Sequence, residues 1–244
     1  FHMNDSGVYV TPASRGASHT STALARLDEN GAASYTFDLE WAPTAPIEVP
    51  ETAQILEAGS ISAIIEPGAS AVLDALTRGR EHALVCFDPN ARPSIMGEPA
   101  VALVSLERFI ALADVVKVSD EDIEWLTGGV PIDKVVNRWL GMGPSLVVVT
   151  RGKHGSDVAT ASGLRFTKTT SDVKVVDTVG AGDSFMGGMI DAMWGMGLRG
   201  ADAREALRAL PEEQVRAIID RASAVSDVTV SRKGANPPWA HELS

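Results

Sequence analysis

Short apolar segments alternate with helical segments over most of the chain, and this alternation constrains the fold more than any other feature of the sequence. Four apolar runs are typical of buried strands: residues 60–65, 83–88, 114–118 and 145–150. Helical segments lie between or after them: residues 69–80, 99–113, 120–126 and 132–140. Strands that alternate with helices form parallel sheets covered on both faces. The sequence therefore predicts an α/β fold.

Two further segments have the pattern of β-hairpins. Residues 20–28 and 33–39 alternate apolar and polar side chains around a turn at Glu29-Asn30-Gly31. A second hairpin is predicted within residues 155–170, and two long helices follow, one from Ala181 and one over residues 211–224. A linker is predicted over the Pro-rich residues 41–50. We therefore expect two parts: residues 1–46 with the first hairpin, and residues 47–244 with the α/β body.

The charge balance restricts the partners. The formal net charge is −11 over 244 residues, which argues against nucleic acid and anionic membranes as ligands. We expect no membrane span, because no apolar run is long enough, and residues 1–5 do not resemble a signal peptide. The single cysteine, Cys86, lies in an apolar run and is predicted to be a small buried residue, which favours a reducing, cytoplasmic location.

Polar residues directly follow three of the predicted strands. They occupy residues 88–92, 117–120 and 150–153. In open parallel sheets, ligands bind outside the carboxyl ends of the strands, and these ends meet at one edge. The sequence therefore predicts one ligand site built from all three segments.

The tetrapeptide Gly180-Ala181-Gly182-Asp183 carries the clearest chemical signal. Small residues let a backbone approach a ligand closely, and a helix that begins there directs N–H groups and a positive dipole end toward a phosphate. An Asp in the first helical turn could then accept the proton of an attacking hydroxyl group. The same residues also occur where a helix simply begins after a glycine hinge, with an Asp that compensates the dipole.

The longer run DTVGAGDSFMGG, residues 177–188, resembles the second signature of the PfkB family of carbohydrate kinases. Other family-like segments are residues 87–93 at a strand end, 148–155 at the nucleotide loop and 229–237 near the adenine and a monovalent-cation loop. The match is closest to fructokinase-like members. The resemblance implies a ribokinase-like three-layer αβα fold with a mostly parallel sheet and a small β lid.

The resemblance also implies residue roles. Asp183 would be the catalytic base in contact with the substrate, and the N–H groups of Gly180, Ala181 and Gly182 would form the anion hole. The nucleotide-binding residues implied are Asn90, Lys117, Ser119, Thr150, Arg151, Gly152 and Gly155. Arg92 would bind the phosphates or an anionic end of the sugar. Lys117, at a strand end, is equally well interpreted as a surface lysine.

The implied cofactors are ATP, Mg²⁺ and a monovalent cation such as K⁺. Asp122 would bind magnesium through a water molecule, and Asp177 and Val179 would offer oxygens to the monovalent cation. The family has Asn-x-x-Glu where this chain has Ser119 and Asp122. Because these side chains are shorter, we expect a lower affinity for the metal.

The predicted function is ATP-dependent phosphorylation of a small sugar, with fructose as the first choice. Open alternatives are 2-keto-3-deoxygluconate, a nucleoside, and a binding protein on the same fold without turnover. Residues 1–50 match neither the family's sugar-binding first strand nor its Gly-Gly motif, so we expect the first part of the fold to be missing from the chain. A homodimer through the lid hairpin is also expected, because a lone hairpin is marginal in water.

Overall fold

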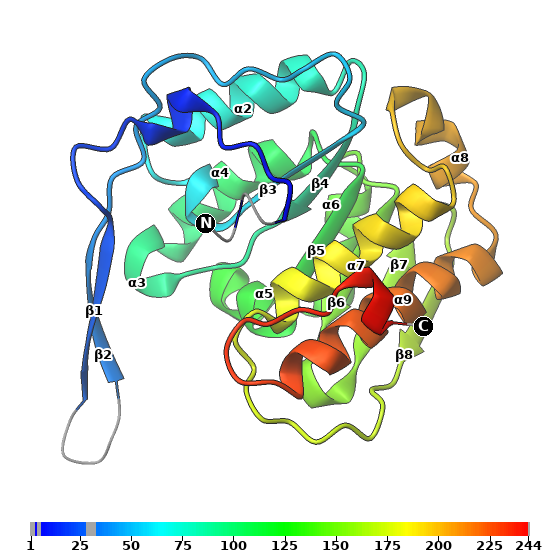
Figure 1. Cartoon of the computed structure of the whole chain (residues 1–244). Coiled ribbons are helices and arrows are strands. Elements are labelled where there is room, and N and C mark those ends of the chain that lie inside the picture. Colours follow the sequence, from blue (N-terminus) through cyan, green and yellow to red (C-terminus); the bar gives the residue numbers. More distant parts are fainter. Residues whose placement is uncertain (1–2, 4–5, 28–32, 244) are drawn as a thin grey trace.

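A six-stranded sheet forms the centre of the molecule (Figure 1). The computed structural model describes residue 3, residues 6–27 and residues 33–243. In spatial order, the strands are β3 (Ile55–Gly59), β4 (Leu84–Asp88), β5 (Val115–Ser119), β6 (Leu146–Thr150), β7 (Ser156–Thr160) and β8 (Arg165–Lys168). The first four are parallel, and β7 and β8 are added antiparallel. The carboxyl ends of β3 to β6 therefore share one edge.

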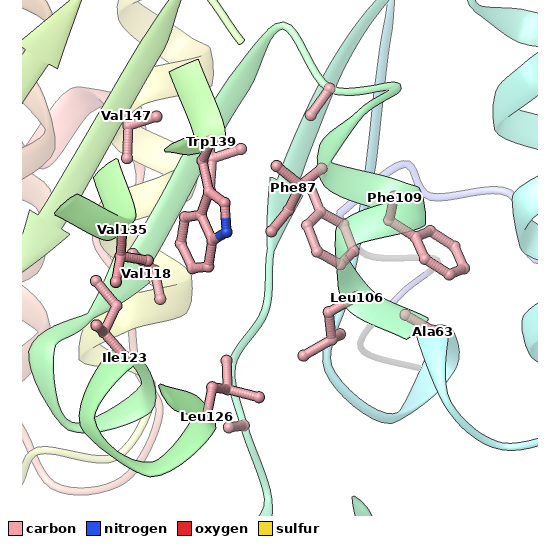
Figure 2. Close-up of a cluster of buried hydrophobic side chains, with 14 of the residues drawn as sticks. Ala63, Phe87, Leu106, Phe109, Val118, Ile123, Leu126, Val135, Trp139 and Val147 are labelled. Carbon is pink, nitrogen blue, oxygen red and sulfur yellow. The ribbon is translucent and has the colours of Figure 1, made fainter. Parts of the chain in front are cut away.

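One helical layer covers the first face of the sheet. Its helices are α2 (Gly68–Gly79), the short α3 (Pro93–Met96), α4 (Pro99–Ile110), α5 (Asp120–Thr127) and α6 (Ile132–Leu140). They pack on alternate residues of the strands, and the buried side chains include Phe87, Phe109 and Trp139 (Figure 2). The rings of Phe87 and Phe109 stack with centroids 5.4 Å apart.

The second helical layer covers the opposite face. It consists of α7 (Ala181–Gly195), α8 (Arg204–Arg208) and α9 (Glu212–Val230). Met186, Met189 and Met193 of α7 are buried against the other set of strand residues, which includes Cys86. Two buried clusters on the two faces of one sheet make a three-layer αβα structure, so the predicted fold class is confirmed.

The first hairpin stands away from this body (Figure 1). It consists of β1 (Thr22–Leu27) and β2 (Ala33–Asp38), paired antiparallel in a sheet of their own. The predicted turn at residues 29–31 lies outside the described residues. No helix in the described part of the chain is long and apolar enough to cross a membrane.

The predicted strand at residues 60–65 is wrong. The strand is β3, Ile55–Gly59, and residues 60–63 form a 3₁₀ turn. Ser60 adopts a positive φ of 55°, and the Ser62 hydroxyl donates to the Gly59 carbonyl at 2.7 Å, so the backbone turns away from the sheet there. The alternating serines and isoleucines of residues 60–65 have the pattern of a strand, whereas Glu57 interrupts the apolar pattern of β3.

The other predicted elements lie within a few residues of the observed ones. The structure adds two findings: the sheet to which the second hairpin belongs and the greater length of the last long helix. The hairpin of residues 155–170 is β7 and β8, which join the central sheet at its edge. Helix α9 continues to Val230, beyond the predicted residue 224, so the segment that follows it starts close to the carboxyl edge of the sheet.

Candidate active site

The amino end of α7 lies at the carboxyl edge of the sheet and contacts two other segments. Gly180 caps the helix in the left-handed conformation, with φ of 78°. A Cβ atom at Gly180 would lie 2.9 Å from the Cβ atom of Ala235, and one at Gly182 would lie 2.7 Å from Lys117 Nζ. Both glycines are therefore needed for close approach. The Ala181 N–H donates to the Thr178 carbonyl at 3.2 Å, so it already has a partner within the turn.

Asp183 lies in the first turn of α7 and is held by a polar chain from the end of β4. The Asn90 side-chain amide donates to Asp183 Oδ1 at 3.2 Å. Arg92 Nη1 in turn donates to Asn90 Oδ1 at 2.7 Å and to the Ala91 carbonyl at 2.8 Å. Arg92 therefore orients the amide that orients Asp183.

A cavity of about 550 Å³ opens beside Asp183. Its walls come from β3, α2 and the 41–50 linker, and Asp88 and Asn90 line it together with Asp183. Arg92 lines a different hollow, between the first hairpin and α3. An acceptor in the first cavity would meet the Asp183 carboxylate without meeting Arg92.

Lys117 is buried, so its interpretation as a surface lysine is wrong. Only 3% of the residue is exposed, and Nζ lies 2.6 Å from Asp88 Oδ2. Burial raises the pKa of Asp88, although the Lys117 ammonium acts in the opposite direction. Asp88 Oδ1 is buried and has no hydrogen-bond partner among the described residues. The Lys117 ammonium of this pair therefore lies next to Gly182, and Asp88 Oδ1 is the oxygen that stays without a partner.

Glu57 belongs to this cluster, and sequence reasoning did not identify it. The residue lines the same cavity from the edge strand β3. Although Glu57 is partly exposed at the edge of the sheet, desolvation of its carboxylate at the cavity wall, together with the negative charges of Asp88 and Asp183, raises its pKa to about 7. A charged residue in the middle of an apolar strand was the signal that could have found it.

Ser119 and Asp122 form a capping box at the start of α5. The Asp122 N–H donates to Ser119 Oγ at 3.0 Å, and the Ser119 N–H donates to Asp122 Oδ2 at 3.3 Å. Asp122 Oδ1 also accepts the Ala91 N–H at 3.0 Å. Both Asp122 oxygens are therefore used to fix two loops at the edge of the sheet, a role that the family comparison of this position did not predict.

The segment after β6 contains the predicted nucleotide residues. Thr150 donates to the Val118 carbonyl at 3.3 Å, which ties the ends of β5 and β6 together. The Arg151 guanidinium pairs with Asp157 at 3.2 Å. Gly152 is open on the side of its missing Cβ, whereas a Cβ at Gly155 would lie 1.9 Å from the Lys168 carbonyl oxygen. Gly155 is thus explained by packing against β8, and Gly152 lies free for a ligand.

Asp177 joins the segment before α7 to the segment after α9. Its carboxylate accepts the Val179 N–H at 3.0 Å and the Gly234 N–H at 2.9 Å. These backbone hydrogen bonds, that from Val179 first, lower the pKa of Asp177. Val179 itself is exposed. The two segments named for the monovalent cation therefore lie together.

Comparison with known proteins gives concordant matches. The family described as pfkB family carbohydrate kinase matches residues 1–242. A probable fructokinase-2 of Arabidopsis thaliana is 33% identical over 194 residues, which are 78% of this chain and 56% of that protein. The chain spans about half the length of the curated relatives that it matches first.

Solved structures agree with these matches. A fructokinase from Xylella fastidiosa with bound ATP superposes with a TM-score of 0.79 at 26% identity, covering 96% of this chain and 74% of that one. A fructokinase from Vibrio cholerae with fructose, ADP and calcium gives a TM-score of 0.71 at 28% identity, over 96% and 75% of the two chains.

Proposed function

Because the chain belongs to the pfkB family of carbohydrate kinases, we propose that it transfers the γ-phosphoryl group of ATP to a hydroxyl group of a small sugar, as a fructokinase does. The observation that carries the proposal is the position of Asp183. It lines the 550 Å³ cavity on one side. On the other side, at the start of the same helix, Gly180 lies against Ala235 and Gly182 lies against Lys117.

The sugar binds in the cavity, and the nucleotide binds along the ends of β5 and β6. Asp183 accepts the proton of the sugar hydroxyl as its oxygen bonds to the phosphorus, and ADP leaves. The N–H groups at the start of α7 and the helix dipole stabilise the charge on the transferred group. Asn90 keeps the Asp183 carboxylate oriented, so the base is in place before the sugar arrives.

Magnesium is usually bound by one or two carboxylates together with the phosphates of the nucleotide, and not by a cage of protein ligands alone. No group of three or more His, Cys, Asp or Glu side chains within the described ranges could hold a metal ion. Both carboxylate oxygens of Asp122 already accept backbone N–H groups, from Ser119 and from Ala91. The assignment of Asp177 and Val179 to a monovalent cation stays a prediction.

The first hairpin, within residues 1–46, is proposed as a lid over the acceptor side and as the contact between two copies of the chain. The hollow beneath it is lined by Thr22, Phe37 and Arg92. Leu24 of β1 is 54% exposed, which favours a partner surface over water. Light scattering should show a dimer; a monomer at high protein concentration would count against it.

The kinase proposal is tested with Asp183→Asn and a control on the same helix, Asp191→Asn. Asp191 pairs with Arg221 at the surface, so its loss should leave turnover unchanged. Loss of the base in Asp183→Asn should lower turnover at least about a hundredfold while ATP binding is retained. Sugar-dependent ADP release measures the effect. Turnover at the wild-type rate in Asp183→Asn would remove Asp183 from the mechanism, and a wild-type chain that binds ATP without turnover would favour the non-catalytic alternative.

A further inference from the structure

The cavity beside Asp183 has an unusual charge distribution. Its ionisable lining residues are all acidic: Glu48, Glu57, Asp88 and Asp183. No Lys, Arg or His is among the described residues that line it, although Lys117 lies behind Asp88. The remaining walls are largely apolar side chains of α2, β3 and the 41–50 linker. A ligand in this cavity therefore meets negative groups and apolar surface, and no described cationic side chain on the lining.

Two buried polar atoms of the lining residues lack partners among the described residues. They are Asp88 Oδ1, an acceptor, and Trp41 Nε1, a donor. Asp88 is only 4% exposed, so leaving its oxygen unpaired costs free energy unless a ligand donates to it. A hydroxyl group is both donor and acceptor, and it can satisfy either atom. Because the Trp41 indole packs against Gly68, Asp88 Oδ1 is the position that a ligand hydroxyl group can satisfy from the cavity.

Glu57 lies on β3, the edge strand of the sheet (Figure 1), and lines the cavity. We infer that Glu57 determines the charge of the acceptor: its carboxylate accepts hydrogen bonds from the hydroxyl groups of an uncharged sugar and repels sugar acids. The inference rests on the proposed kinase function and deepens it, because it names the substrate class. Of the acceptors left open by the sequence, it favours neutral fructose over the anionic 2-keto-3-deoxygluconate.

Arg92 offers no counter-charge for a sugar acid in this cavity. Its Nη1 donates to Asn90 and Ala91, and its side chain lines the other hollow. Lys117 is committed to Asp88. An anionic acceptor beside Asp183 would therefore add a like charge to the cluster without a cation to offset it.

The state of Glu57 depends on its charged neighbours on each surrounding element. Its pKa of about 7 follows from burial and from Asp88 and Asp183, with Lys117 acting in the opposite direction. The ionisable groups that face it are Asp88 and Cys86 of β4, Lys117 of β5, Asp183 of α7 and Glu48 of the linker. The described cavity-lining residues of α2 are apolar. Repulsion of a sugar acid should consequently weaken when the pH falls below 7.

The test compares binding of fructose and 2-keto-3-deoxygluconate by calorimetry in the presence of a non-hydrolysable ATP analogue. At pH 8 the wild-type chain should prefer fructose. Glu57→Gln should reduce the preference about tenfold, the order expected for like charges several ångströms apart near a surface. The matched control is Glu51→Gln, which removes the same charge from an exposed residue outside the cavity and should leave the ratio unchanged.

A second arm needs no substitution. Between pH 8 and pH 6 the wild-type preference should fall toward that of Glu57→Gln, while the ratio for Glu57→Gln stays constant. Three results would overturn the inference: an unchanged ratio in Glu57→Gln, a wild-type ratio independent of pH, or binding of neither sugar. Failure of the kinase proposal is measured separately, by the release of ADP. Selective fructose binding without ADP release refutes turnover and still supports charge selection by Glu57.

Discussion

Two buried aspartates at opposite ends of the sheet have different surroundings. Asp114, just before β5, is 1% exposed, and Asp88, at the end of β4, is 4% exposed. Asp114 Oδ1 accepts from Arg204 at 2.6 Å, and Oδ2 accepts from the Val85 N–H at 2.9 Å. The Arg80 guanidinium is a second cation, 3.6 Å from Oδ1. Asp88 has Lys117 as its hydrogen-bond partner and one open oxygen.

The difference separates a structural carboxylate from one available to a ligand. Asp114 links α8 to the amino ends of β4 and β5, and each of its oxygens is satisfied. At Asp88 the network is incomplete and the neighbouring charges, Glu57 and Asp183, are repulsive. A protein keeps such an unfavourable arrangement where binding completes it. Substitutions at four residues, Asp114, Asp88, Ser119 and Glu57, would break or sharpen this comparison.

The largest loss of stability is expected for Asp114→Asn. The change removes a buried carboxylate and leaves the partly buried Arg204 guanidinium without its counter-charge, which should lower the free energy of unfolding by about 3 kcal/mol. Urea denaturation measures the change. Asp172→Asn, at an exposed loop position, is the control and should stay within about 0.5 kcal/mol of the wild type.

A smaller loss, of about 1.5 kcal/mol, is expected for Asp88→Asn. Lys117 loses its paired charge, but the Asn side-chain oxygen still accepts from it, Glu57 stays nearby as a negative neighbour, and repulsion of Asp88 by Glu57 and Asp183 is relieved. The same urea titration applies. If Asp88→Asn cost as much as Asp114→Asn, the distinction between the two ends of the sheet would not hold.

The cap of α5 should contribute about 1 kcal/mol, the usual value for an N-cap side chain. Ser119→Ala removes the acceptor of the Asp122 N–H and should lower the free energy of unfolding by that amount. Ser119→Asp retains a capping oxygen and should restore most of the loss. Equal stability of the Ala and Asp variants would show that the capping box is energetically neutral.

The smallest effect is a pH-dependent one at Glu57. Its pKa in the folded chain, about 7, is above the ordinary value of 4.5, so the folded state binds the extra proton between these pH values. Stability should therefore fall as the pH rises from 4.5 to 7. Glu57→Gln should be more stable than the wild type at pH 8, by less than about 1 kcal/mol because solvent screens the exposed side chain, and the gain should vanish at pH 5. Thermal melts at both pH values test the sign.

The misplaced strand shows where local pattern and fold diverged. The serine and isoleucine alternation of residues 60–65 satisfies a strand pattern, yet Ser60 and Ser62 close a turn there. The true strand contains Glu57, which a pattern search penalises because charged residues rarely occur in buried strands. The departure from the pattern lies in the cavity beside Asp183, as expected when a local rule is broken at a binding site.

By itself the sequence determined the α/β class, the order of the elements and the run around Asp183, because hydrophobic periodicity and glycine-rich turns are local properties. Only the tertiary structure decided that Lys117 is buried against Asp88, that Ser119 and Asp122 are used as a cap, and that Glu57 lines the cavity beside Asp183. The physical reason is that burial, charge pairing and cavity lining depend on which strand ends lie side by side, and periodicity along one chain does not contain that information.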